Sequence, residues 1–104
     1  MEIGETPNFR KGLEDTSVPS GQDLVLDIEV DGKPKSVKWY KAGNPLDAAK
    51  NKRIKIEKLD DSHYRLTVKN VTPEDAGEYS VEAENDAGSA KSKANINVEG
   101  KSKI

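Results

Sequence analysis

Apolar and polar residues alternate with a period of two along most of this chain. In residues 24–31 every second position is Leu, Ile or Val, and three of the four residues between them are acidic. Successive side chains of a β-strand point to opposite faces, so this pattern predicts a strand with one buried and one exposed face. The alternation recurs in the segments 37–40, 53–57, 64–69, 78–84 and 90–98. Helical periodicity is absent, and the chain is therefore predicted to be all-β.

Clusters of turn-forming residues separate these predicted strands. They are Pro19-Ser20-Gly21, Asp31-Gly32-Lys33-Pro34, Gly43-Asn44-Pro45, Asp60-Asp61-Ser62 and Asn85-Asp86-Ala87-Gly88. Short strands at this spacing, broken by Gly and Pro, predict a sandwich or barrel of antiparallel sheets. In the predicted strand 53–57, Ile54 and Ile56 are expected to share the buried face.

The segment 75–81 carries the most informative motif. Its sequence, Asp-Ala-Gly-Glu-Tyr-Ser-Val, has the form Asp-x-Gly-x-Tyr-x-Cys that opens the sixth strand of an immunoglobulin domain, but Val81 stands in the cysteine position. Ile28 fills the position of the second-strand cysteine, and Trp39 lies between the two. The Cys…Trp…Cys spacing is thus kept in outline, with both sulfurs replaced by aliphatic side chains.

The chain resembles the immunoglobulin superfamily, and most closely its intermediate set (I-set), from Pro7 to Val98. Further matching elements are Phe9, Leu13, Val18, Gly21, and the segments 32–34, 37–41, 64–71 and 83–88. The resemblance implies a two-sheet antiparallel sandwich with Greek-key connections, here without a disulfide. The motifs in segments 75–79 and 84–88 are similar to those of domains in giant muscle proteins such as titin, twitchin, obscurin and myosin-binding protein C.

The resemblance also implies structural roles for individual residues. The residues expected in the core are Ile28, Trp39, Leu66, Tyr79 and Val81. Tyr79 is expected to form the tyrosine corner, two residues before the missing cysteine. Arg53 and Asp75 are expected to form an ion pair at the base of the sandwich.

Composition indicates a single small domain with a thin core. The 104 residues include 21 Leu, Ile, Val and Phe, and the net charge is −2. We expect one domain over residues 7–99, with residues 1–6 and 100–104 as flexible ends or linker. The chain contains no cysteine, which is typical of a reducing compartment and predicts a cytoplasmic, cytoskeletal or myofibrillar location. No apolar run has the length of a membrane helix, so no membrane association is expected.

The sequence offers little for catalysis or metal binding. His63 is the only histidine, and it follows the polar turn 60–62. A metal site at Asp61 and His63 is conceivable, but two neighbouring ligands on a turn do not enclose an ion, which favours a solvated turn residue. Without a nucleophile and base in a supporting context, or a phosphate-binding loop, we expect no enzyme activity, no catalytic residue and no cofactor.

The charge distribution provides the one functional indication. Residues 33–58 hold nine Lys and Arg against two acids, whereas residues 1–32 and 59–88 each hold two against eight. One hypothesis is a basic edge that docks an acidic partner, formed by Lys50, Lys52, Lys55 and Lys58.

Charge pairing across neighbouring strands is the alternative explanation. It would place Asp27 and Glu29 near Arg65 and Lys69, and it would place Glu82 and Glu84 between lysines of the adjacent strands, Lys38, Lys91 and Lys93. Nucleic-acid binding is not expected, because the chain is acidic overall and poor in exposed aromatic residues.

The sequence therefore predicts a structural and protein-interaction domain of a large intracellular, sarcomeric protein, acting as a spacer and a docking surface. The expected partners are muscle or cytoskeletal proteins, including neighbouring immunoglobulin and fibronectin domains, and the isolated domain is expected to be a monomer. Two alternatives are a regulatory domain flanking a kinase in a giant muscle protein and an extracellular adhesion domain. A signal peptide or paired cysteines in flanking domains would favour the adhesion domain.

Overall fold

A computed structural model describes residues 6–100 as nine strands and one 3-10 turn. The elements are β1 (Asn8–Lys11), β2 (Thr16–Pro19), β3 (Leu24–Asp31), β4 (Ser36–Lys41), β5 (Asn44–Pro45), β6 (Ile54–Lys58), β7 (His63–Val68), η1 (Pro73–Asp75), β8 (Gly77–Asn85) and β9 (Gly88–Glu99). All six strands predicted from alternation are present. The others, β1, β2 and β5, have four residues or fewer, too few for a period of two to stand out.

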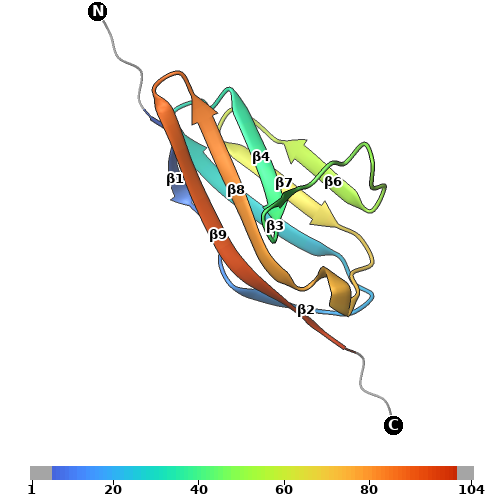
Figure 1. The fold of residues 1–104 in the computed structure, drawn as a ribbon. Coiled ribbons are helices and arrows are strands. Elements are labelled where there is room, and N and C mark those ends of the chain that lie inside the picture. The colour runs from blue at the N-terminus through green and yellow to red at the C-terminus, as the bar shows by residue number, and fades with distance from the viewer. Residues whose placement is uncertain (1–5, 101–104) are drawn as a thin grey trace, which may run out of the picture.

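The strands form two sheets that pack face to face (Figure 1). One has the order β1-β3-β7-β6 and the other the order β2-β9-β8-β4-β5. The chain changes sheet between β1 and β2, between β2 and β3, between β3 and β4, between β5 and β6, and between β7 and β8. Connections that cross between the sheets in this way are typical of Greek-key sandwiches. The predicted all-β, two-sheet sandwich is confirmed.

One strand pair corrects the expectation of purely antiparallel sheets. β2 runs parallel to β9, with Val18 opposite Val98. The chain leaves the first sheet after β1 and joins the second at β2, so its direction there matches that of the last strand. Gly12 permits this crossing, because a Cβ at this position would lie 2.5 Å from Ser92 Oγ of β9. The neighbouring Leu13 N–H donates to the same hydroxyl at 2.8 Å.

The core lies between the sheets and is made of the inward-facing apolar residues. Its buried members are Val18, Leu24, Leu26, Ile28, Val30, Trp39, Ile54, Tyr64, Leu66, Val68, Val71, Tyr79, Val81, Ala83, Ile96 and Val98. Trp39 is 1% exposed and stands opposite Val81 in the β4–β8 register. Ile28 from the other sheet belongs to the same cluster, so the two former cysteine positions are filled by buried aliphatic side chains.

Ile56 does not share the burial of Ile54. It is 37% exposed, whereas Ile54 is buried. Both belong to β6, which is the last strand of its sheet, so Ile56 has a strand neighbour on one side only. Ile56 faces inward as expected, opposite Leu66 in the register, but it is not buried, because alternation does not show how closely the two sheets cover an edge strand.

The two ends of the described chain lie at opposite ends of the sandwich, one before β1 and the other after β9 (Figure 1). The predicted flexible ends, 1–6 and 100–104, lie outside the described residues except for Thr6 and Gly100. Within residues 6–100, no helix is both long enough and apolar enough to span a bilayer.

Replacing Trp39 tests how far the core depends on this one side chain. Trp39→Ala is expected to lower the free energy of unfolding by about 3–5 kcal/mol, because it empties the largest fully buried site. Trp39→Phe should lower it much less, since the ring keeps most contacts and removes a buried indole N–H that has no partner among the described residues. Urea unfolding followed by circular dichroism measures both. A loss below about 1 kcal/mol for the alanine variant would contradict the placement of Trp39 in the core.

Candidate functional site

Arg53 and Asp75 meet at the base of the sandwich. Arg53, in the loop before β6, places Nη2 against the Asp75 carboxylate at the end of η1. The same guanidinium donates from Nε to the Lys69 carbonyl at 3.1 Å and from Nη2 to the Asn70 carbonyl at 3.1 Å. One side chain thus connects the start of β6, the chain that follows β7, and η1.

Asp75 is also a hydrogen-bond acceptor for two neighbours in sequence. Its carboxylate accepts the Thr72 N–H at 2.8 Å, and its main-chain carbonyl accepts the Tyr79 hydroxyl at 2.7 Å. Burial acts to raise the pKa of Asp75, but the hydrogen bonds from Thr72 and Arg53 outweigh it and lower this pKa below its ordinary value. Burial, helped by the Asp75 charge, raises the pKa of Tyr79 to about 12. Both groups keep one protonation state near neutral pH, which suits a structural role.

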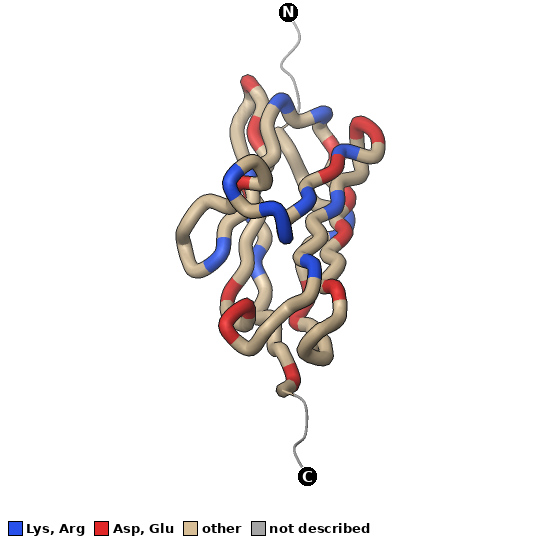
Figure 2. The backbone as a smooth tube through the Cα atoms, turned by 90° about the vertical axis from the view of Figure 1, so that its right-hand side faces the viewer, with Lys and Arg blue, Asp and Glu red and all other residues tan. Residues whose placement is uncertain are grey.

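The four lysines of the predicted basic edge fall into two pairs. Lys55 and Lys58 lie on β6, where their Nζ atoms lie 3.6 Å from Glu57 and 3.5 Å from Asp61. Lys50 and Lys52 lie in the loop between β5 and β6, exposed and without an ion pair to any residue of the range 6–100. Figure 2 faces this side of the molecule; Lys and Arg positions gather across its middle and top with acidic positions between them, and further acidic positions lie in its lower loops.

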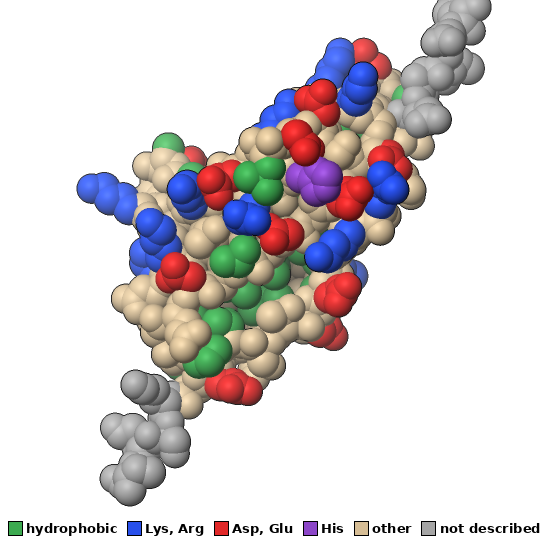
Figure 3. Space-filling view, turned by 180° about the vertical axis from the view of Figure 1, so that it is seen from behind, with side chains coloured by type: hydrophobic (Ala, Val, Ile, Leu, Met, Phe, Trp, Pro, Cys, Tyr) green, Lys and Arg blue, Asp and Glu red, His purple; other side chains and the backbone are tan. Residues whose placement is uncertain are grey.

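The outer face of the β1-β3-β7-β6 sheet pairs most of its charges internally. Arg65 Nε lies 2.6 Å from Asp27, its register partner on β3. Glu29 contacts Arg10 at 3.2 Å and His63 at 3.6 Å, so the expectation that Lys69 would lie near it was wrong. Figure 3 shows acidic and basic side chains interspersed over this face, with the histidine beside acidic groups.

On the outer face of the other sheet, Glu82 and Glu84 were predicted to lie between lysines of the adjacent strands. The strand register confirms this for Glu82 alone. Glu82 stands between Lys38 of β4 and Lys91 of β9 in the strand register. Glu84 instead stands between Ser36 and Ser89, because the register places serines at both neighbouring positions. Lys93 Nζ approaches Glu78 at 3.9 Å.

His63 pairs with Asp60 and not with Asp61. Its Nδ1 lies 2.8 Å from Asp60 Oδ1, and the same oxygen accepts the main-chain N–H groups of Ser62 and His63. Asp61 contacts Lys58 instead. In the described part of the chain, no three His, Asp or Glu side chains gather as metal ligands would. The hydrogen bond to Asp60 raises the pKa of His63 above its ordinary value; burial opposes this rise, and the charges of Asp60 and Glu29 add to it.

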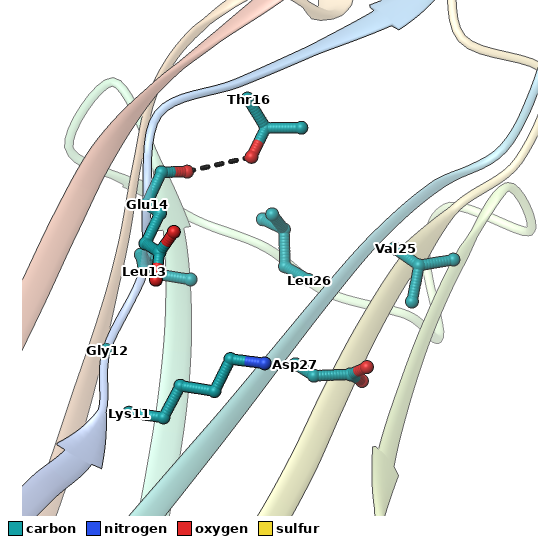
Figure 4. Close-up of a pocket in the computed structure, with 8 residues that line it drawn as sticks. All are labelled: Lys11, Gly12, Leu13, Glu14, Thr16, Val25, Leu26 and Asp27. Atoms are coloured by element: carbon teal, nitrogen blue, oxygen red, sulfur yellow. Dashed lines mark hydrogen bonds between the residues drawn. The ribbon is translucent and has the colours of Figure 1, made fainter.

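A hollow of about 190 Å³ lies where the chain crosses from β1 to β2 (Figure 4). Leu13 and Leu26 line it, and Lys11 and Asp27 border it at one end. The Thr16 hydroxyl donates to the Glu14 carbonyl at 2.9 Å and so closes the bend of the crossing. These residues offer no nucleophile beside a base, and the hollow is explained by the crossing itself.

A second opening lies between the two sheets at the edge where β4 and β6 face each other. It has a volume of about 260 Å³, and its lining includes Val37 of β4, Ile56 of β6 and Tyr64 of β7. Sequence reasoning missed it, because alternation predicts that all three side chains point inward and says nothing about how closely the sheets approach. No local signal in the sequence marks it, because its lining residues come from β4 and the turn before it, from β6 and from β7.

Comparison with known proteins identifies the type of domain. The family model described as "Immunoglobulin I-set domain" matches residues 7–98. The chain is 50% identical over 98 residues to "Muscle M-line assembly protein unc-89" of Caenorhabditis elegans, a match covering 94% of this chain and 1% of that protein. The chain therefore spans only a small part of this relative's length.

Solved structures agree with this match. The crystal structure of the titin M3 domain superposes with a TM-score of 0.82 at 35% identity, covering 89% of this chain and 96% of that one. A titin M10–obscurin-like 1 immunoglobulin complex contains a chain with a TM-score of 0.84 at 30% identity, covering 93% of this chain and 97% of that one. Both proteins are built on the same sandwich as this chain.

Removing the Asp75 carboxylate tests the connection at the base of the sandwich. Asp75→Ala is expected to lower the free energy of unfolding by about 1–3 kcal/mol, because it leaves the Thr72 N–H and Arg53 without their shared acceptor. Glu74→Ala is the matched control, since this exposed acid in the same 3-10 turn has no side-chain partner among the described residues. Urea unfolding at neutral pH measures both, and equal losses for the two variants would refute the role of Asp75.

The His63–Asp60 pair predicts a pH dependence of stability. A raised pKa of His63 stabilises the fold below the unfolded-state value near 6.5, and this contribution is lost as pH rises through the folded-state pKa. A lowered pKa of Asp60 stabilises the fold above 3.8, and that contribution is lost as pH falls. The melting temperature should therefore decline from about pH 6 to about pH 8 through this pair.

Two substitutions isolate the effect. Asp60→Asn should flatten the decline of the melting temperature, whereas Asp61→Asn should leave it as in the unaltered chain, because Asp61 contacts Lys58 and not His63. Differential scanning calorimetry across this range measures it. A decline that survives Asp60→Asn unchanged would mean that other groups carry the pH dependence.

Proposed function

The chain belongs to the immunoglobulin I-set family, and from this membership we propose that it is a structural and protein-interaction module of a large muscle protein. The observation that carries the proposal is the identity, over nearly the whole chain, to one small segment of a muscle M-line assembly protein. A chain that matches one small segment of such a protein is suited to act as one unit in a series. A myofibrillar location follows from the same proposal.

The positions of the chain ends support a spacer role. The chain enters before β1 and leaves after β9 at opposite ends of the sandwich (Figure 1). Domains joined through such ends extend in a line, with each domain adding its length to the series. β2, the second strand, runs parallel to the last strand, β9, so tension that reaches β2 through the N-terminal chain loads the hydrogen bonds of this pair along the strand direction. The sandwich is thus arranged to resist extension of the chain.

The unpaired lysines support a docking role beside the spacer role. Lys50 and Lys52 are exposed charges in one loop, while the flat outer face of β3 and β7 already pairs its Asp and Arg side chains. Unpaired surface charges of one sign attract a partner of opposite sign and accelerate association. The partner we propose is a protein of the muscle filaments, such as another immunoglobulin domain of the kind seen beside titin M10 in its complex with obscurin-like 1.

Affinity capture from striated-muscle extract tests this role. A variant with Glu at Lys50, Lys52, Lys55 and Lys58 should lose a filament protein that the unaltered chain retains, identified by mass spectrometry. The matched control carries Glu at Lys38, Lys69, Lys91 and Lys93, which changes the net charge equally at other surfaces. Equal capture by all three chains, or capture by none, would leave the spacer role alone.

A further inference from the structure

The opening between β4 and β6 is a place where the two sheets fail to close over their own apolar side chains. Val37 faces inward from one sheet, and Ile56 and Tyr64 face inward from the other. β5 pairs with β4 only at residues 40–41, so β4 has no strand neighbour on this side over residues 36–39. β6 is the edge of the other sheet. The opening, called here the edge groove, is therefore flanked by two free strand edges.

The edge groove exposes apolar surface that the rest of the domain buries. Ile56, part of its lining, is 37% exposed. Leu59, next in the chain after β6, is 48% exposed but is not part of the lining. The third exposed large apolar side chain in residues 6–100 is Val25, on the outer face of the central strand β3. The Tyr64 hydroxyl forms no hydrogen bond to any residue in that range, and it is not a buried atom without a partner, so it is open to water. Exposed apolar surface in a groove is typical of an interaction site.

The volume of the edge groove limits what it can hold. Sites for drug-sized ligands occupy about 300–1,000 Å³ and bury most of the ligand. At about 260 Å³, and open along one side, the edge groove is below that range. It has room for an apolar side chain of a partner protein, with the partner's main chain passing outside along the edge.

The lysines around the edge groove favour a partner with negative charge. Lys35 and Lys58 are part of its lining, and Glu57 is its one acidic lining residue. Beyond the lining, Lys33 lies in the turn before β4, and Lys50 and Lys52 lie in the loop before β6; none of the three has an ion pair within the described residues. This is the basic side seen in Figure 2. A partner segment that runs along this edge meets an excess of positive charge at both ends of its path.

We propose that the edge groove binds an acidic protein segment that inserts one apolar side chain between Val37 and Ile56. Acidic residues before and after the inserted side chain face Lys33 at one end and Lys50 and Lys52 at the other, whereas Lys35 is already paired with Asp86. Charge supplies attraction over distance, and burial of the apolar side chain supplies selectivity among acidic segments. This inference rests on the docking role proposed above and specifies where and what the domain docks.

The test uses the whole chain and two synthetic acidic peptides that differ only in a central residue, Leu or Ser. Nuclear magnetic resonance titration of the isotope-labelled chain reports both the affinity and the residues contacted. The Leu peptide is expected to shift the amide signals of Val37 and Ile56 and to bind about tenfold more tightly than the Ser peptide. A single-stranded oligonucleotide serves as a polyanion without an apolar anchor.

Matched substitutions separate the apolar and the charged contributions. Ile56→Thr should remove the preference for the Leu peptide, whereas Val25→Thr, a similar change at an exposed β-branched residue away from the groove, should preserve it. Lys50→Glu with Lys52→Glu should weaken both peptides by about tenfold at low salt and less at high salt. Lys91→Glu with Lys93→Glu applies the same charge change to the other sheet and should leave both affinities unchanged.

The outcomes distinguish this inference from the docking role on which it rests. Equal binding of the two peptides, unaffected by Ile56→Thr, overturns the groove and leaves a basic docking edge in place. An oligonucleotide that binds as tightly as the Leu peptide also overturns it, because the edge would then be a site for any polyanion. The absence of amide shifts with either peptide overturns the groove as well, and the docking role then depends on the capture experiment alone.

Discussion

The sandwich depends on apolar packing between two sheets that no disulfide cross-links. Ile28 and Val81 occupy the two positions at which an immunoglobulin domain carries its inter-sheet disulfide, and both are fully buried beside Trp39. A disulfide in a small domain stabilises by about 2–5 kcal/mol, and burial of an aliphatic side chain contributes about 1.5–3 kcal/mol. The two replacements together are therefore of the same size as the bond they replace. The fold consequently keeps its geometry in a reducing environment, provided that this one cluster remains closely packed.

The charged contacts at the base of the sandwich fix the connection between β7 and β8, which apolar packing alone does not determine. Apolar packing is non-directional, so it fixes that the sheets face each other but not how their connections run. Arg53 holds the carbonyls of Lys69 and Asn70 together with the Asp75 carboxylate, and Tyr79 reaches the Asp75 carbonyl from β8. These directional bonds fix the crossing from β7 to β8, where the chain changes sheet. Packing and hydrogen bonding thus act on different parts of the fold.

The local pattern of apolar and polar residues predicted the central strands. It failed where contacts between distant parts of the chain determine the structure. β3, β7, β8 and β9 each bury one face along most of their length, and alternation therefore located them. The crossing from β1 to β2 depends on Gly12 lying against Ser92, eighty residues later in the chain, and no local pattern encodes that approach. The resemblance to the family placed Arg53 and Asp75 together, whereas local sequence could not tell that His63 pairs with Asp60 and not with Asp61. The exposure of Ile56 follows from its position at the opening between the β4 and β6 edges, which only the strand order reveals.

The same strand order changes the meaning of the basic segment 33–58. Its charge in the sequence overstates the charge available to a partner, because Arg53, Lys35, Lys55 and Lys58 already contact carboxylates of this domain. The lysines that remain unpaired flank a free sheet edge, where charge also prevents pairing with the strands of other chains. A partner that docks there must neutralise these lysines before it reaches the apolar side chains behind them. Protection of the edge and selection of an acidic partner therefore need the same residues, and one arrangement of charge satisfies both requirements.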